Sequence, residues 1–248
     1  MGSSRAVLLP GTASDGVFVR SVFAAPLASA GLSLITPAGA TVEEHLAALD
    51  AAYLGEPLIV GGVSLGAHVA AAWAARTPER CAGLLLALPA WSGPAAGAPA
   101  ALAAAVSAEV VERDGVDAAL AGVDGWLGAE LSRAWRGHGA ALAGVLRAAS
   151  STAAPTLGEL AALDVPAGVA ACTDDPVHPL AVAQQWAAAL PRGALRTTTL
   201  AELGTDRTAL GRAAVAALLD SRAGADGATR SRVRDSRGVV TGPDGRGR

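Results

Sequence analysis

Residues 62–66, Gly-Val-Ser-Leu-Gly, place a serine between two glycines at the spacing Gly-x-Ser-x-Gly. The serine follows an apolar run (58–63) and precedes an alanine-rich stretch (65–77). A strand that turns tightly into a helix needs glycine on both sides of the serine, because a Cβ there would collide with neighbouring backbone. The helix would also point free backbone N–H groups at the hydroxyl. The pattern therefore predicts that Ser64 is a nucleophile on a strand-to-helix elbow.

The glycines of this segment allow other interpretations. The chain holds 30 Gly, so the spacing can arise by chance. A dinucleotide-binding fingerprint needs glycines at its first, third and sixth positions, whereas here they stand at 61, 62 and 66. A phosphate-binding loop needs a Gly-Lys pair, which the sequence lacks. The strand before the serine and the helix after it favour the nucleophile.

Six short apolar runs must position this serine, and they alternate with stretches that suit helices. The runs are 6–9, 32–36, 58–63, 82–88, 167–172 and 195–200; the helical stretches are 19–30, 42–54, 65–77, 179–190 and 207–220. Such alternation predicts parallel strands joined by right-handed crossover helices on both faces. Most runs are apolar throughout, as expected of strands buried on both faces. The last run holds three Thr and is expected at an edge of the sheet.

A long insertion separates the fourth and fifth runs, at about residues 91–160. It is rich in Ala and Leu, carries Trp91, Trp126 and Trp135, and predicts several short helices. Insertions of this length in compact domains usually serve a site, so a lid is favoured over additional core. We expect one domain over residues 1–220. From residue 221 the pattern dissolves into Gly, Arg and Asp, which predicts a disordered tail over 221–248.

Composition excludes several classes of protein. With 52% hydrophobic and 17% charged residues the chain is expected to be globular, and it has no apolar run of roughly 18 residues that would span a membrane. The net charge is −3, which provides no basic field for nucleic acid. Cys81 and Cys172 lie in apolar stretches without metal or disulfide spacing. We expect a cytoplasmic protein with no metal and no cofactor.

With these motifs the chain resembles the α/β-hydrolase superfamily from about Arg5 to Asp220, without that family's first two strands. The resemblance implies an α/β fold, a mostly parallel sheet of about six strands with helices on both faces and a helical lid insertion. It also implies an oxyanion hole formed by the backbone N–H groups of Thr12, in the loop after the first strand, and Leu65. As an alternative, the Pro-Gly pair before Thr12 can be an ordinary turn.

The segment 173–179, Thr-Asp-Asp-Pro-Val-His-Pro, resembles the acid loop of the same family. By its position before Pro176, Asp175 corresponds to the carboxylate that orients the catalytic histidine, and Asp174 is the less favoured substitute. Asp-Asp-Pro is also a common way to leave a strand and start a helix, so a purely structural role stays open.

The family's histidine is expected after the last strand, but no histidine follows residue 200. Asp206 stands at about that position, and a carboxylate is a weak base at neutral pH. His178 is the leading replacement, because it preserves the order Ser, Asp, His and lies three residues after Asp175. It would have to cross two strand spacings, roughly 10 Å, to reach Ser64. Alternatively, it caps or packs against the following helix.

The other three histidines are weaker candidates. His138 could descend from the insertion towards the serine. His68 lies one helical turn past Ser64, and His45 lies in an amphipathic stretch, so both are expected to be structural.

Two classes of function follow from the resemblance and these residues. The first is a serine hydrolase with Ser64, Asp175 and His178 as its triad, acting on an ester, thioester or amide of a small, largely apolar molecule; a transferase using the same serine is a variant. The second is a catalytically silent relative that binds a small ligand or a partner, as the missing histidine suggests. The oligomeric state does not follow from the sequence.

Overall fold

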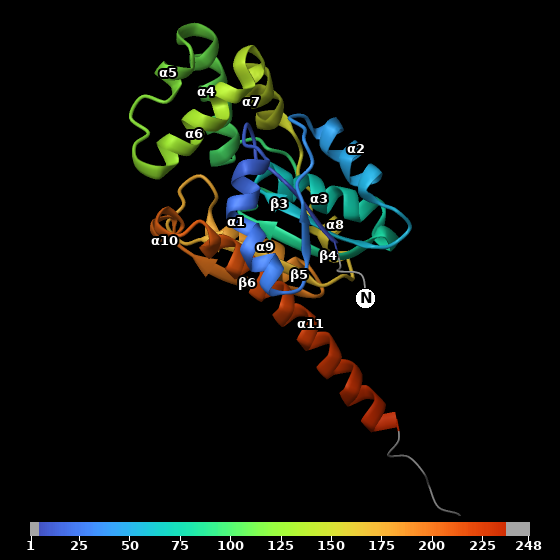
Figure 1. Ribbon diagram of the computed structural model, residues 1–248. Helices are drawn as coiled ribbons and strands as arrows, with labels where there is room; N and C mark the ends of the chain where they lie inside the picture. Colours follow the sequence, from blue (N-terminus) through green and yellow to red (C-terminus); the bar gives the residue numbers. More distant parts are fainter. Residues whose placement is uncertain (1–4, 237–248) are drawn as a thin grey trace, which may run out of the picture.

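The computed structural model describes residues 5–236, and in them a six-stranded parallel sheet forms the centre of the molecule (Figure 1). Its order is β2-β1-β3-β4-β5-β6. The strands are β1 (Arg5–Leu9), β2 (Ser33–Ile35), β3 (Leu58–Val63), β4 (Cys81–Ala87), β5 (Ala167–Cys172) and β6 (Gly193–Thr198). Each coincides with a predicted run to within one or two residues, and the α/β fold with a mostly parallel sheet is confirmed.

Burial follows the apolar pattern of the strands. Strands β3 and β5 are buried along their whole length, as expected when helices cover both faces. Strand β6 is an edge strand, and its Arg196 and Thr197 are exposed. The prediction that the Thr-containing run forms an edge is therefore confirmed.

Helices cover both faces of the sheet (Figure 1). On one face α1 packs against α11, and their buried side chains share a core with β1, β4 and β5. On the other face α2, α3, α8 and α9 enclose a second core that contains Trp73 and Trp186. The bounds are α1 (Gly16–Ser29), α2 (Val42–Ala52), α3 (Leu65–Arg76), α8 (Leu157–Ala161), α9 (Leu180–Ala189), α10 (Leu200–Thr205) and α11 (Thr208–Ser236), with a 3-10 turn η1 (Pro78–Arg80) before β4.

The insertion (residues 91–160) forms a separate helical layer at one end of the sheet (Figure 1). It contains α4 (Pro99–Asp114), α5 (Val116–Ala119), α6 (Gly125–His138), a 3-10 turn η2 (Gly139–Ala141) and α7 (Leu142–Ser151). These helices pack on one another around a small core of their own, which includes Trp135 and Leu146. The predicted group of short helices is present.

The last helix is longer than the sequence suggested. We expected a disordered tail from residue 221, but α11 continues to Ser236, because no proline interrupts the stretch after Asp220 and Ala and Arg favour helix. Ser221 is buried, and its Oγ donates to the carbonyl of Arg192 and accepts from the N–H of Ala167. The rest of the predicted tail, 237–248, lies outside the described residues.

Within the described residues, every helix is too short or too polar to cross a lipid bilayer.

Candidate active site

Ser64 lies on the elbow that the glycine pattern predicted, between β3 and α3. Its backbone has φ 53° and ψ −116°, a left-handed conformation that is costly for a residue with a side chain. A Cβ on Gly62 would lie 2.3 Å from the carbonyl oxygen of Leu9, and one on Gly66 would lie 2.4 Å from the same oxygen. Glycine at both positions is therefore a steric requirement of this turn.

The ring of His178 bridges Ser64 and Asp175. Its Nε2 lies 3.0 Å from Ser64 Oγ, and its Nδ1 lies 2.9 Å from Asp175 Oδ2. Both residues of the pair are largely buried, with 17% of the His178 side chain and 6% of the Asp175 side chain exposed. The structure thus brings together the three residues that sequence analysis proposed as a triad, while their catalytic role stays a prediction.

Asp175 is held as a carboxylate by the turn in which it lies. Burial alone would raise its pKa, but the hydrogen bond from the His178 ring, with those from the N–H groups of His178 and Val177, holds the pKa below the ordinary 3.8. An ionised carboxylate can only accept, so Nδ1 of His178 must carry the proton. Nε2 is then free to accept the hydroxyl proton of Ser64.

The loop after β5 carries His178 to the serine. In the sheet β4 lies between β3, which ends directly before Ser64, and β5, which leads to Asp175. Residues 173–179 therefore cross the end of β4. This crossing covers the two strand spacings that, from the sequence, separated His178 from Ser64. Asp174, the alternative acid, faces elsewhere and accepts the N–H of Leu200 at the start of α10.

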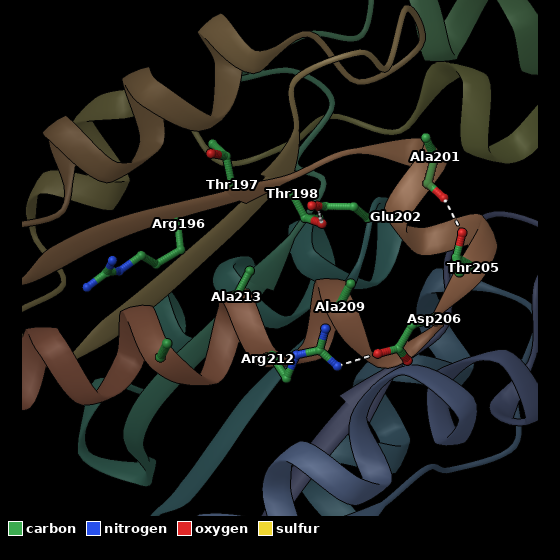
Figure 2. A pocket seen from close by; sticks show the side chains of 11 residues that line it. Arg196, Thr197, Thr198, Ala201, Glu202, Thr205, Asp206, Ala209, Arg212 and Ala213 are labelled. Carbon is green, nitrogen blue, oxygen red and sulfur yellow. Dashed lines mark hydrogen bonds and ion pairs between the residues drawn. The ribbon is translucent and has the colours of Figure 1, made fainter.

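Asp206, at the place where the resemblance predicted a histidine, has a structural role. It accepts hydrogen bonds from the N–H and Oγ1 of Thr208 and pairs with Arg212, which lowers its pKa to about 2. These contacts cap the first turn of α11. Beside it, a cavity of about 670 Å³ opens between β6, α10 and α11, lined among others by Thr198 and Glu202 (Figure 2). The cavity lining does not include the triad.

The other histidines have no hydrogen bond to Ser64 in the part of the chain that the structure describes. His68 is buried, accepts the N–H of Ala90 at 3.0 Å and lies edge-on to Trp91; burial lowers its pKa to about 3. His45 is also buried, which lowers its pKa. His138 ends α6 in the insertion. None of the three reaches the serine as a base would.

The loop after β1 passes directly beside the nucleophile. A Cβ on Gly11 would lie 3.4 Å from the Cβ of Ser64. Thr12 is the next residue in the loop after this close approach. Ser14 N–H donates to the carbonyl of Gly11, which closes a turn with Thr12 and Ala13 at its centre. Leu65 is the first residue of α3, where a backbone N–H has no partner within its own helix. The assignment of Thr12 and Leu65 as oxyanion donors stays a prediction.

Metal ligands were not expected, and the described residues contain no group of three or more His, Cys, Asp or Glu side chains arranged to hold an ion.

No protein-family model matches this chain, and no curated protein matches it. Solved structures do. A Mycobacterium tuberculosis protein assigned as the non-heme bromoperoxidase BpoC has a TM-score of 0.67 at 19% identity, covering 89% of this chain and 93% of that one. An enol-lactonase from Burkholderia xenovorans has 0.62 at 18%, covering 94% and 91%. A thermophilic esterase from Thermogutta terrifontis has 0.58 at 17%, covering 79% and 81%. At these identities the likeness shows a shared fold.

Proposed function

We propose that this chain, which belongs by its fold to the α/β-hydrolase superfamily, is a serine hydrolase that cleaves a small, largely apolar ester, thioester or amide. The observation that carries the proposal is the continuous hydrogen-bonded series Ser64 Oγ, His178 Nε2, His178 Nδ1 and Asp175 Oδ2. Each pair in this series has the separation that a nucleophile, its base and the orienting acid require.

In the proposed reaction Ser64 Oγ attacks the acyl carbon, and His178 Nε2 takes the hydroxyl proton. The carbonyl oxygen becomes an oxyanion held by the N–H groups of Thr12 and Leu65. When the intermediate collapses, the bond to the leaving group breaks, and His178 returns the proton to the departing alcohol, thiol or amine. Water then attacks the acyl-enzyme with the same base, releasing the acid and restoring Ser64.

Asp175 supports this cycle through its charge. Because the carboxylate stays ionised at neutral pH, it stabilises the imidazolium that forms when His178 accepts the proton. Its second oxygen accepts two backbone N–H groups of its own loop, which fixes the orientation of the pair. The proposed acid and base are therefore held together within one turn of the same loop.

The proposed substrate class rests on the surroundings of the site. The insertion lies over the loop after β1 and has an apolar core of Ala, Leu and Trp side chains, so we assign it as a lid. Proteins that share this fold include an esterase, an enol-lactonase and a thioesterase domain. Each of these names describes the transfer of an acyl group to water. As the substrate of this chain we propose a small molecule.

The experiment is intact-mass spectrometry after incubation with a fluorophosphonate, which phosphonylates activated serines. We expect one adduct on the wild type and none on Ser64→Ala, which removes the hydroxyl and leaves the elbow. His178→Ala and Asp175→Asn should slow labelling by about 100-fold or more, since the base or its orientation is lost. Hydrolysis of p-nitrophenyl butyrate should fall in parallel.

His138→Ala serves as the matched control, because it removes an imidazole from the insertion that has no hydrogen bond to Ser64, and it should label like the wild type. Labelling of Ser64→Ala, or normal labelling of His178→Ala, would contradict the assigned triad. A wild type that does not label would favour the silent, ligand-binding relative.

A further inference from the structure

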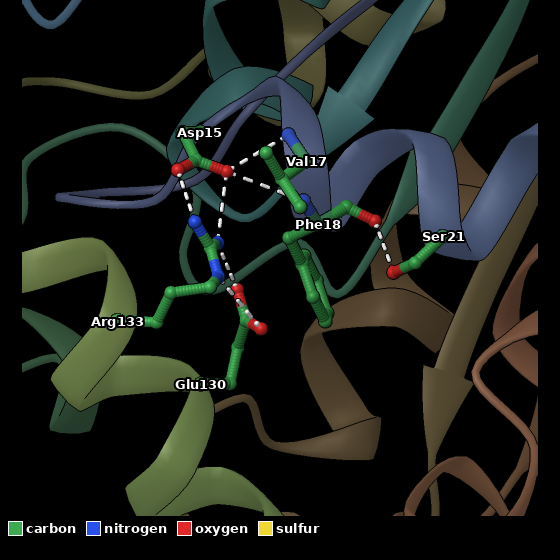
Figure 3. Close-up of polar contacts among 6 residues, drawn as sticks. All are labelled: Asp15, Val17, Phe18, Ser21, Glu130 and Arg133. Atoms are coloured by element: carbon green, nitrogen blue, oxygen red, sulfur yellow. Dashed lines mark hydrogen bonds and ion pairs between the residues drawn. The ribbon is translucent and has the colours of Figure 1, made fainter.

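A bidentate ion pair joins the loop after β1 (residues 10–15) to helix α6 of the insertion (Figure 3). Arg133 Nη1 lies 2.6 Å from Asp15 Oδ2, and Arg133 Nη2 lies 2.9 Å from Asp15 Oδ1. Glu130, one turn earlier on α6, accepts a further hydrogen bond from the same guanidinium. Two parallel N–H···O bonds define direction as well as distance, so the pair fixes α6 relative to the loop.

Asp15 also fixes the end of its own loop. Its Oδ1 accepts the N–H of Val17 at 2.8 Å and that of Phe18 at 3.3 Å, which makes it the N-cap of α1. The hydrogen bond from Arg133 contributes most to lowering the pKa of Asp15, so the carboxylate is charged at neutral pH. One side chain therefore connects three parts: the loop, α1 and the insertion.

Ala13 supplies a second, independent contact between the same loop and the insertion. It has φ 51°, a conformation that is strained for a residue with a Cβ, and only 3% of it is exposed. It packs in the core of the insertion with Ala108, Trp135 and Leu142. In that core, among the described residues, Ala13 is the one member that lies outside residues 91–160. The insertion thus encloses the strained residue of the loop.

We propose that helix α6 sets the position of the oxyanion loop, with Asp15 and Arg133 as positioning residues for the backbone N–H of Thr12. This inference rests on the proposed function. At Gly11 the loop passes so close to Ser64 that an added Cβ would lie 3.4 Å from the Ser64 Cβ, and at Ala13 and Asp15 it contacts the insertion. The N–H of Thr12 lies between these points, so its position depends on both. Loss of the ion pair would therefore release the loop that carries the proposed oxyanion donor.

The test uses three variants of the full chain. Arg133→Gln removes the ion pair, and Asp15→Asn removes its charge while keeping an oxygen that can cap α1. Arg147→Gln is the matched control: it breaks the bidentate pair with Glu112, which joins α4 and α7 inside the insertion and does not contact the loop.

Hydrogen exchange at the amides of residues 11–18 should be about tenfold faster in Arg133→Gln and Asp15→Asn, because opening of the loop becomes easier. For p-nitrophenyl butyrate kcat should fall about tenfold with KM little changed, since an oxyanion donor acts in the transition state. Arg133→Lys should restore part of kcat. Arg147→Gln should leave loop exchange and kcat at wild-type values.

Unchanged exchange of the loop in Arg133→Gln would overturn the inference whatever the activity. Equal acceleration in Arg147→Gln would also overturn it, because the effect would then be general loosening of the insertion. Faster exchange of the loop in Arg133→Gln, together with a wild type that neither labels nor hydrolyses the ester, would uphold the coupling of insertion and loop while the proposed function fails.

Discussion

At the scale of single residues, the proposed acid and base stand three positions apart in the sequence. Asp175 and His178 lie in one turn, so their contact needs no distant segment to be placed correctly. The position after β6, where the resemblance predicts a histidine, is held by Asp206, which caps α11. The proposed base, His178, lies instead in the loop after β5 and reaches Ser64 from there.

His68 gives a prediction at the same scale. Its buried ring has a pKa of about 3, below the ordinary 6.5, so between these values the unfolded chain binds more protons than the folded one. Stability must therefore fall as the pH falls, by about 1.4 kcal/mol per unit from this residue. Urea unfolding at pH 7 and pH 5 should show this loss, and His68→Gln should reduce it by about 2 kcal/mol.

His138→Gln is the matched control for this measurement, because it makes the same substitution at a histidine of the insertion that is only partly buried. Carboxylates with a lowered pKa, such as Asp15 and Asp175, stay ionised between pH 5 and pH 7, so they do not contribute to the change in stability over this range. An identical pH dependence in His68→Gln and the wild type would contradict the assignment.

At the scale of elements, β3 and α3 meet in a turn that leaves no room for a side chain at Gly62 or Gly66, two positions to either side of Ser64. Carbonyl oxygens of the neighbouring strand β1 and the loop after it occupy that space. The nearest neighbours of a Cβ added at either glycine are therefore backbone atoms, not flexible side chains. The elbow is therefore as sensitive to a methyl group as a buried core position is.

Gly62→Ala should destabilise the protein by about 3 kcal/mol or more and abolish labelling of Ser64, since the added Cβ meets two backbone groups that cannot both move. Gly144→Ala is the matched substitution: it lies inside α7 with nothing within 4 Å of the added Cβ, and should gain up to about 1 kcal/mol. Urea unfolding of both variants is the measurement. Equal stabilities would contradict the steric account.

At the scale of the whole molecule, two of the long-range connections between the layers are those of α11 and of the insertion. Helix α11 crosses β4, β5 and β6, and its buried Leu218 and Ser221 reach the start of β5. The insertion is joined to the rest through Asp15 and Arg133, and through Arg207, which lies 4.2 Å above the ring of Trp126. One connection stabilises the sheet, and the other relates the insertion to the site.

Ending the chain after Ala223 should leave thermal unfolding close to that of the full chain, whereas ending it after Ala216 should lower stability by several kcal/mol or prevent folding. The shorter chain loses the fully buried Ala217 and Leu218 and the hydrogen bonds of Ser221. Circular dichroism during heating measures the difference. If both truncated chains melted together, α11 would not hold the sheet as described.

Much of the fold and part of the site follow from the sequence alone. Apolar runs determine the strands, because strands covered on both faces exclude polar residues. The glycines around Ser64 determine the elbow, because the steric requirement is local. The spacing of Asp175 and His178 allows their contact, because three residues form one turn.

Only the tertiary structure decided which histidine meets the serine, because that depends on the path of a loop across β4. It also decided the end of α11 and the contact between Asp15 and Arg133, which lie far apart in the sequence. Periodicity and local spacing describe neighbours along the chain. Contacts between distant segments arise from how whole layers pack, and no local pattern in the sequence carries that information.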